Sequence, residues 1–195
     1  YVFPWDCVVL TRSDVVLKMA YIAWMTNDIR LREELCTYLP ALESYNRASY
    51  IGIVLARTES KVEQEYVLQS LGDRSADIRD EAYKVLSEMS LSPEQYQHIE
   101  ELLRFKYSEM RINAINLLMK QPEAQLAASI RRLLSDKNAE RRLAGLDMMK
   151  SIRNVDFLKD SYQKLLSTVR EILKPNAKEK ILIESLIGDG TEQSP

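Results

Sequence analysis

Residues 71–86 read LGDRSADIRDEAYKVL, and this turn followed by an amphipathic helix decides the fold. Its key positions are Leu71, Arg79, Ala82 and Leu86. They recur as Leu103, Arg111, Ala114 and Leu118, and again as Leu133, Arg141, Ala144 and Met148. A self-similar period of roughly thirty residues marks units that cannot bury their apolar faces alone and must stack. The sequence therefore predicts an all-α fold of stacked helix pairs.

Helix-start signals place the helices of these repeats. Ser60 and Glu63 have the spacing of a capping box, and Ser92 with Pro93 and Gln95 gives a second one. A small alanine at one fixed position of each repeat indicates where paired helices cross closely. We therefore expect three clear repeats over residues 60–153.

The N-terminal flank fits the same period less well. One step back, Leu39 and Arg47 stand where Leu71 and Arg79 stand in the first clear repeat. This predicts a degenerate earlier repeat, so that residues 1–59 hold further helices. The expected helices of this flank cover residues 13–25, about 28–38 and about 42–56.

The C-terminal flank predicts one more helix pair over residues 154–188, with helices at about 155–173 and 177–187. Residues 189–195 are a polar tail. Residues 1–195 are thus expected to form a single α-solenoid domain of about ten helices.

Composition and charge narrow the classes of function. The 195 residues are 46% hydrophobic and 29% charged, with a formal net charge of −2 and a sequence pI near 5.7. The slight negative charge disfavours nucleic acid as a partner, because polyanion binding draws on clustered Lys and Arg. No apolar run is long enough to cross a bilayer and no export signal is visible, so we expect a cytoplasmic protein that does not contact membranes.

Few residues have the pattern of a metal or catalytic site. Cys7 and Cys36 are the only cysteines. Two reduced thiols are expected, and a disulfide between them is the alternative. Glu94, His98 and Glu101 share one face of a helix, but a lone histidine with two glutamates is more typical of a polar surface than of a metal site. Neither a phosphate-binding Walker loop nor a G-x-S-x-G nucleophile motif occurs. We expect no cofactor, no metal and no catalytic residue.

The turn Asp73, followed by Ile78-Arg79, Ala82 and Leu86, resembles the signature of the HEAT-repeat family and of the broader armadillo-like superhelix. The resemblance covers about residues 60–150 and implies a right-handed superhelix of antiparallel helix pairs that binds proteins and carries no catalytic residues. Two positions depart from the pattern. Phe105 replaces the turn aspartate in the second clear repeat, and Glu140 replaces the apolar residue before Arg141.

One arginine recurs in every repeat. The partner-binding candidates are Arg47, Arg79, Arg111 and Arg141, together with Arg142 in the basic third repeat. One interpretation is a cationic stripe on the concave helix face that binds an acidic peptide or protein. The favoured interpretation is structural, because an arginine beside a turn carboxylate can form hydrogen bonds within and between layers. The turn carboxylates available for this are Asp73, Asp77, Glu109 and Asp136.

The third clear repeat has a local excess of basic residues, which are Arg131, Arg132, Lys137, Arg141, Arg142, Lys150 and Arg153. An alternative function follows from a HEAT-like class of alkylpurine DNA glycosylases, which bind duplex DNA on a basic concave face with aromatic residues. Here Trp5 and Trp24 lie far in sequence from this repeat, and a solvated helix face is favoured.

A non-enzymatic protein-binding scaffold is the main expectation. A purely structural spacer is the third hypothesis, and exposed apolar layers at an end of the stack would favour it.

Tyrosines concentrate in the N-terminal half, as Tyr21, Tyr38, Tyr45, Tyr50 and Tyr66. Aromatic side chains are enriched at protein interfaces. Because these tyrosines fall on apolar stripes, we expect them to pack within or between helix layers, with the hydroxyl groups at the rim.

Overall fold

The computed structural model describes residues 11–172 and 174–188, and in these residues it contains eleven α-helices, two short 3-10 helices and no strand. The predicted all-α class is confirmed. The chain divides into two compact units, residues 1–90 and residues 91–195. Cys7, Trp5 and the polar tail fall outside the described residues. No described helix combines the length and the apolar character that a bilayer span requires.

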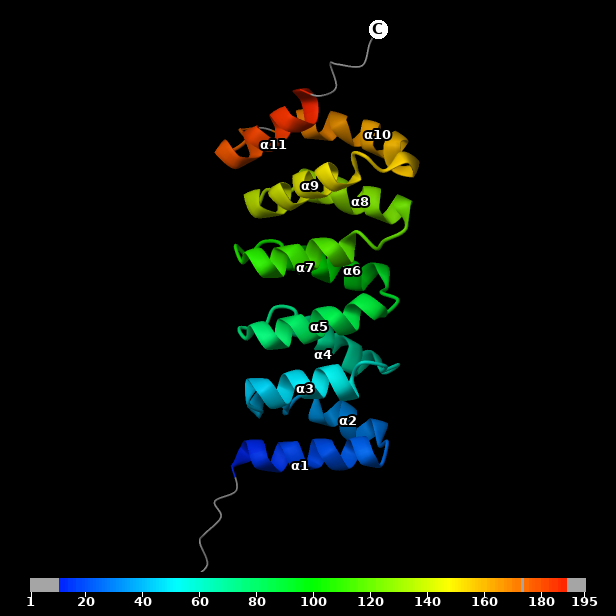
Figure 1. The fold of residues 1–195 in the computed structure, drawn as a ribbon, viewed down its shortest axis with the longest axis vertical. Coiled ribbons are helices and arrows are strands. Elements are labelled where there is room, and N and C mark those ends of the chain that lie inside the picture. The colour runs from blue at the N-terminus through cyan, green and yellow to red at the C-terminus, as the bar shows by residue number, and fades with distance from the viewer. Residues whose placement is uncertain (1–10, 173, 189–195) are drawn as a thin grey trace, which may run out of the picture. The chain divides into compact units, whose positions relative to one another are not determined.

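The first unit holds the helices α1 (Arg12–Met25), α2 (Ile29–Leu35), η1 (Leu39–Ala41), α3 (Ser44–Val54), α4 (Lys61–Ser70) and α5 (Ala76–Glu88) (Figure 1). The first helices of successive helix pairs contact each other, and so do the second helices: α2 packs on α4, and α3 packs on α5. α1 contacts α2 and η1, and α4 contacts α5. Leu39, Ile51, Leu55, Val67 and Ile78 are fully buried between these helices.

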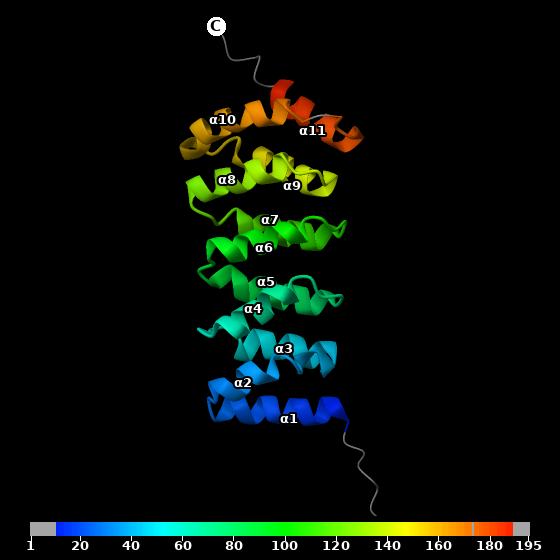
Figure 2. The ribbon, with the colours of Figure 1, turned by 180° about the vertical axis from the view of Figure 1, so that it is seen from behind.

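The second unit holds α6 (Pro93–Leu102), α7 (Ser108–Leu118), α8 (Glu123–Leu134), α9 (Ala139–Ile152), η2 (Asp156–Leu158), α10 (Lys159–Arg170) and α11 (Ala177–Gly188). α8 contacts both α6 and α10, and Figure 2 shows it between them. α9 likewise contacts both α7 and α11. The two helices of the middle pair of this unit, α8 and α9, therefore pack on the corresponding helices of the pairs before and after them.

The predicted close crossings are present. Ala82, Ala114 and Ala144 are at most 2% exposed. A further close crossing lies at Gly145 in α9, where an added Cβ would come within 3.1 Å of Leu133 Cβ in α8. Small residues at these positions let the helix backbones approach one another.

Two helix ends differ from the sequence prediction. The helix expected over residues 28–38 ends at Leu35, and Pro40 lies in the separate 3-10 helix η1. Proline fixes its own φ and disfavours helical backbone at the residue before it, so the chain leaves the α-helix ahead of Pro40. The helix expected from residue 155 begins at Lys159, because residues 156–158 form the 3-10 helix η2.

Capping boxes fix several helix starts. The Ser92 box is complete: Ser92 N donates to Gln95 Oε1 at 2.8 Å, and Gln95 N donates to Ser92 Oγ at 3.3 Å. The Ser60 box is half formed, because Ser60 Oγ accepts from Glu63 N while the Glu63 carboxylate binds elsewhere. The Glu63 carboxylate is therefore free to accept hydrogen bonds from other residues inside the unit.

Candidate functional site

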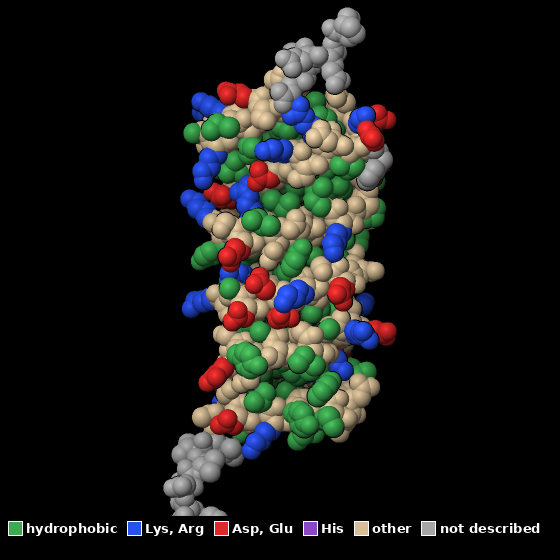
Figure 3. Space-filling view, viewed as in Figure 1, with side chains coloured by type: hydrophobic (Ala, Val, Ile, Leu, Met, Phe, Trp, Pro, Cys, Tyr) green, Lys and Arg blue, Asp and Glu red, His purple; other side chains and the backbone are tan. Residues whose placement is uncertain are grey.

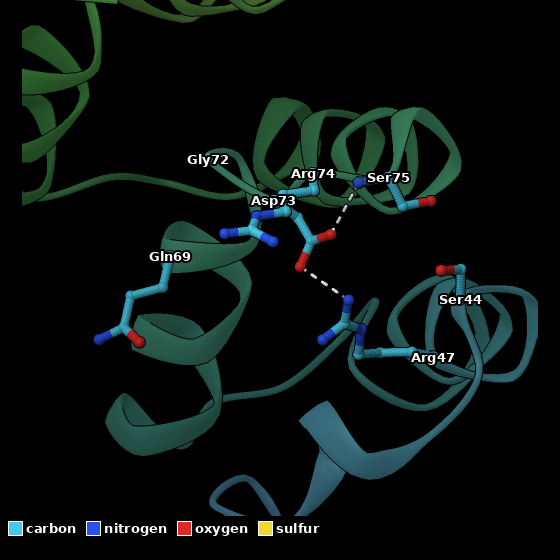
Figure 4. A pocket seen from close by; sticks show the side chains of 7 residues that line it. All are labelled: Ser44, Arg47, Gln69, Gly72, Asp73, Arg74 and Ser75. Atoms are coloured by element: carbon cyan, nitrogen blue, oxygen red, sulfur yellow. Dashed lines mark hydrogen bonds and ion pairs between the residues drawn. The ribbon is translucent and has the colours of Figure 1, made fainter.

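Arg47 lies opposite Asp73 on the surface of the first unit. Arg47 Nη2, from α3, is 2.7 Å from Asp73 Oδ2 in the turn between α4 and α5. Ser75 N, at the start of α5, donates to Asp73 Oδ1 at 2.9 Å. Figure 4 shows the Asp73 carboxylate pointing toward both groups. They line an open pocket of about 470 Å³ with Ser44, Gln69, Gly72 and Arg74. The position where this pocket could bind an anion is therefore filled by the chain's own carboxylate.

Arg79 holds the same turn from the other side. Its Nη1 donates to the carbonyl oxygens of Asp73 and Arg74, each at 3.0 Å. Carbonyl oxygens in a turn have no partner within the helix, and a guanidinium with several donors can satisfy two of them at once. Arg79 therefore contributes to the turn on which Asp73 lies.

Arg111 joins two helices of the second unit. From α7, its Nη2 is 2.6 Å from Asp147 Oδ2 and its Nη1 is 3.4 Å from Glu140 Oε2, both in α9. Glu140 is the residue that departs from the repeat pattern. Its contact with Arg111 gives a physical reason for a charged side chain at a position that is apolar, as Ile78 and Met110, in the other two clear repeats.

Arg141 and Arg142 are adjacent at the start of α9, but they bind different carboxylates. Arg141 Nη1 is 2.9 Å from Asp136 Oδ2 and 3.2 Å from Glu101 Oε1. Arg142 Nε donates to Glu179 Oε1 at 2.7 Å, and its Nη1 donates to the carbonyl oxygens of Asp136 and Lys137. Both guanidinium groups are thus engaged inside the second unit.

All five candidate arginines have partners within their own unit. Asp73 and Asp136 act as the expected turn acceptors, whereas Arg111 in α7 uses carboxylates of α9. These contacts support the structural interpretation of the repeated arginine. A partner-binding role for these five residues stays a prediction.

The sequence did not predict that three glutamates are buried and paired with arginines. The side chains of Glu63, Glu100 and Glu179 are at most 2% exposed, and each accepts hydrogen bonds from an arginine of a neighbouring helix. The arginines are Arg32, Arg132 and Arg142. The hydrogen bond from Arg132 to Glu100 also raises the pKa of that arginine above its ordinary value. Glu179 completes a capping box with Asn176, and this Asn-x-x-Glu spacing is the signal that could have revealed it.

The basic third repeat is partly neutralised by these contacts. Arg132, Arg141 and Arg142 each bind at least one carboxylate, which reduces the positive charge available to phosphates. Among the described residues, no group of three or more His, Cys, Asp and Glu side chains is placed to hold a metal ion.

A polar cluster lies inside the first unit. Burial, and to a smaller extent the nearby Glu63 carboxylate, raises the pKa of Cys36 to about 12. Burial also raises the pKa values of Tyr50 and Tyr66 to about 12. All three groups are neutral at neutral pH, so none of them is an activated nucleophile. The buried Tyr50 hydroxyl has no hydrogen-bond partner among the described residues.

The predicted packing of the tyrosines is correct for Tyr50, which is 6% exposed, and wrong for three others. Tyr21, Tyr38 and Tyr45 are exposed. The reason for Tyr21 is that α1 is covered by other helices on only part of its circumference. The expected inward stripe of this helix is formed instead by Val16, Ala20 and Ala23.

An apolar groove of about 500 Å³ runs between α1 and α2, and we call it the α1–α2 groove. It is lined by Arg12, Val15, Val16, Met19, Leu31, Glu34, Leu35 and Tyr38. Val15, Met19 and Tyr38 are each at least 40% exposed, and the Arg12 guanidinium lies 5.8 Å from the centre of the Tyr38 ring. Figure 3 shows hydrophobic side chains gathered over the part of the first unit that holds α1.

These features define an all-helical protein in which arginine–carboxylate pairs join neighbouring helices and an apolar groove lies open in the first unit. The chain belongs to a family of unknown function, DUF5724, whose model matches residues 1–195. A search of curated proteins and a search of solved structures each found no match.

Proposed function

We propose that this chain is a non-enzymatic, cytoplasmic scaffold that binds a protein or peptide, built as a HEAT-like right-handed superhelix of antiparallel helix pairs. The contacts of α8 with α6 and α10, and of α9 with α7 and α11, support a stacked architecture in the second unit. The repeated register of leucine, arginine and alanine supports its extension to the rest of the chain.

The observation that carries the binding proposal is the α1–α2 groove. Its walls are mainly aliphatic and aromatic, and its two charged residues, Arg12 and Glu34, have opposite signs. Removing apolar surface from water contributes about 25 cal/mol per Å². A groove of this chemistry fits the apolar side of an amphipathic helix, which inserts side chains at spacings of three and four residues. The proposed partner segment is therefore an amphipathic helix.

Selection of helix-forming peptides from a displayed library against the chain tests this function. The affinity of a selected peptide is then measured by fluorescence anisotropy for the unaltered chain, Met19→Glu and Ile181→Glu. Ile181 is a matched control, since it is an exposed aliphatic residue of α11 outside the groove. We expect Met19→Glu to weaken binding at least tenfold and Ile181→Glu to leave it unchanged.

Other outcomes separate the alternatives. If binding survives Met19→Glu and is lost in Arg79→Glu and Arg111→Glu variants that remain folded, the partner binds the arginine surface and the groove assignment is wrong.

The nucleic-acid alternative is tested by a mobility-shift titration with duplex DNA at low salt. We expect no shift at micromolar protein, because key arginines of the basic repeat already bind carboxylates.

A further inference from the structure

The turn between α6 and α7 differs from the equivalent turns of the two neighbouring repeats. The backbone N–H of Phe105 donates to the carbonyl group three residues before it, and the same bond is formed by Asp73 in the α4–α5 turn and by Asp136 in the α8–α9 turn. These three residues therefore hold equivalent positions. In this set of three turns, the α6–α7 turn is the one without a carboxylate at that position.

This replacement gives the α6–α7 turn a positive charge. Residues 73–74 are an Asp and an Arg, and residues 136–137 are an Asp and a Lys, so each of those turns carries one charge of either sign. Residues 104–107 contain Arg104 and Lys106 and no acidic residue. Neither of these two cations forms an ion pair within the part of the chain that the structure describes.

The acidic residues nearest to the turn along the chain already have other partners. Glu101 Oε1 lies 3.2 Å from Arg141 Nη1, and Glu109 also interacts within the chain. The charge of the turn is therefore left for a group outside the described chain.

The turn also exposes two aromatic side chains beside its cations. Phe105 is 40% exposed and Tyr107 is 68% exposed. The Arg104 guanidinium lies over the Phe105 ring, 4.8 Å from its centre. A guanidinium that stacks on a ring uses its flat face and keeps the N–H donors at its edge, which match the geometry of a carboxylate. Arg104 is thus positioned while its donors stay available.

This combination favours an acidic protein segment over a nucleic acid. Binding to a phosphate backbone draws on many Lys and Arg side chains, and the turn supplies two. Other cations of the second unit already bind carboxylates, namely Arg132, Arg141 and Arg142. A peptide carboxylate can accept two parallel hydrogen bonds from one arginine, and aromatic side chains are enriched at protein interfaces.

We propose that the α6–α7 turn binds an acidic segment of a partner protein. Carboxylates of the segment pair with Arg104 and Lys106, and its apolar side chains contact Phe105 and Tyr107. The turn lies in the second unit and shares no residue with the α1–α2 groove, so this binding goes beyond the proposed groove function and does not depend on it.

Selection from a displayed library of peptides in which every second residue is Asp or Glu tests the proposal. The affinity of a selected peptide is measured by fluorescence anisotropy for the unaltered chain, for an Arg104→Glu, Lys106→Glu double variant and for Lys137→Glu. Lys137 is a matched control, because it is an exposed cation in the equivalent turn of the next repeat. We expect the double variant to weaken binding at least tenfold and Lys137→Glu to change it less than threefold.

The contrary results are equally defined. Unchanged affinity in the double variant, or a library that yields no binding peptide, would overturn the proposal. Met19→Glu in the α1–α2 groove is expected to leave the affinity unchanged, so failure of this proposal and failure of the groove function are distinguishable. If thymidine oligonucleotides bind more tightly than the peptide and lose affinity in the double variant, the turn binds single-stranded nucleic acid and the assigned partner is wrong.

Phe105→Asp separates binding from a structural role. The substitution restores the aspartate that the other two turns carry, so the variant is expected to unfold at the same temperature as the unaltered chain or at a higher one. Its affinity for the peptide is expected to fall at least tenfold, because the aromatic contact is lost and a negative charge is added beside Arg104. Unchanged affinity in this folded variant would contradict the proposal.

Discussion

Arg32 binds the carboxylate of Glu63 through two parallel hydrogen bonds, Nε to Oε1 and Nη2 to Oε2, each 2.7 Å long. Glu63 is completely buried, and Thr58 Oγ1 also donates to it. The pair connects α2 to α4 across 31 positions of the sequence. Because a buried carboxylate without a partner is costly, this contact restricts how the two helices can be placed relative to each other.

The second unit repeats this arrangement twice. Arg132 in α8 binds Glu100 in α6 through two hydrogen bonds of 3.1 and 2.6 Å, and Arg142 in α9 binds Glu179 in α11. Each pair joins a helix to the corresponding helix of an adjacent pair. Paired charges inside a stack of helices favour one register over its alternatives, in addition to the apolar contacts.

The N-cap serines Ser92 and Ser75 give a matched test of helix capping. Ser92 accepts a hydrogen bond from Gln95 N, whereas the Ser75 side chain forms no capping bond to α5. Ser92→Ala is therefore expected to lower the free energy of unfolding by about 1 kcal/mol, and Ser75→Ala by a few tenths at most. Urea unfolding followed by circular dichroism measures both. Equal losses in the two variants would contradict the assigned caps.

Two helical glycines are expected to respond to alanine in opposite ways. At Gly145, an added Cβ meets Leu133 and Leu134 at 3.1 to 3.2 Å, so Gly145→Ala should destabilise the chain by about 1–3 kcal/mol. At Gly52, the added Cβ meets the end of the flexible Glu81 side chain, which can move away. Gly52→Ala should therefore gain up to about 1 kcal/mol from helix propensity. Thermal unfolding of both variants checks this, and destabilisation by Gly52→Ala together with a neutral Gly145→Ala would refute it.

Stability is expected to fall in alkaline solution because of the buried tyrosines. Burial raises the pKa values of Tyr50 and Tyr66 to about 12, above the value of about 10 in an unfolded chain. The folded state keeps these protons while the unfolded state loses them. The stability that the two protonated tyrosines contribute is therefore fully present below about pH 10 and is lost as the pH rises toward 12.

Tyr50→Phe isolates one of these groups. Because no described residue forms a hydrogen bond with its hydroxyl, the variant should differ from the unaltered chain by less than about 1 kcal/mol at pH 7. Between pH 9 and about pH 11, its free energy of unfolding should fall less steeply than that of the unaltered chain. Urea unfolding across this range measures how steeply each free energy of unfolding falls with pH, and a steeper fall for Tyr50→Phe would contradict the prediction.

The Cys36 thiol is expected to react slowly in the folded chain. It is buried, and its pKa is raised to about 12, so little thiolate is present at pH 8. In a Cys7→Ser background, labelling with a chromogenic disulfide reagent reports on Cys36 alone. We expect labelling to be at least tenfold slower in buffer than in denaturing urea. Equal rates in the two solvents would show that the thiol is accessible.

Much of the fold could be predicted because its signals are local. The register of Leu71, Ala82 and Leu86 predicted helices whose buried faces the structure confirms, and the Ser92 box predicted the start of α6. The contact of Arg47 with Asp73 is an example of the predicted contacts between repeated arginines and turn carboxylates, although the sequence did not predict which residues pair. Each of these signals depends on residues within one repeat or on its period.

The rest of the candidate site depends on contacts between distant residues. Glu63 lies at a position where a glutamate usually completes a cap, so its use by Arg32 could not be seen in the sequence. Glu100 and Glu101 are adjacent and similar, yet only Glu100 faces the core. The exposure of Tyr21 follows from which sides of α1 other helices cover, and periodicity alone does not determine this.

A double-mutant cycle on Arg32 and Glu63, measured by urea unfolding, tests most directly the claim that arginine–carboxylate pairs hold these helices together. Arg32→Ala is expected to lose about 3–5 kcal/mol, because it leaves the buried carboxylate without its charge partner. The coupling energy of the cycle is expected to be about 1–3 kcal/mol, and Arg30→Ala, an exposed control in the same helix, should stay within about 0.5 kcal/mol. Losses from Arg32→Ala no larger than those from Arg30→Ala, with no coupling to Glu63, would contradict the claim.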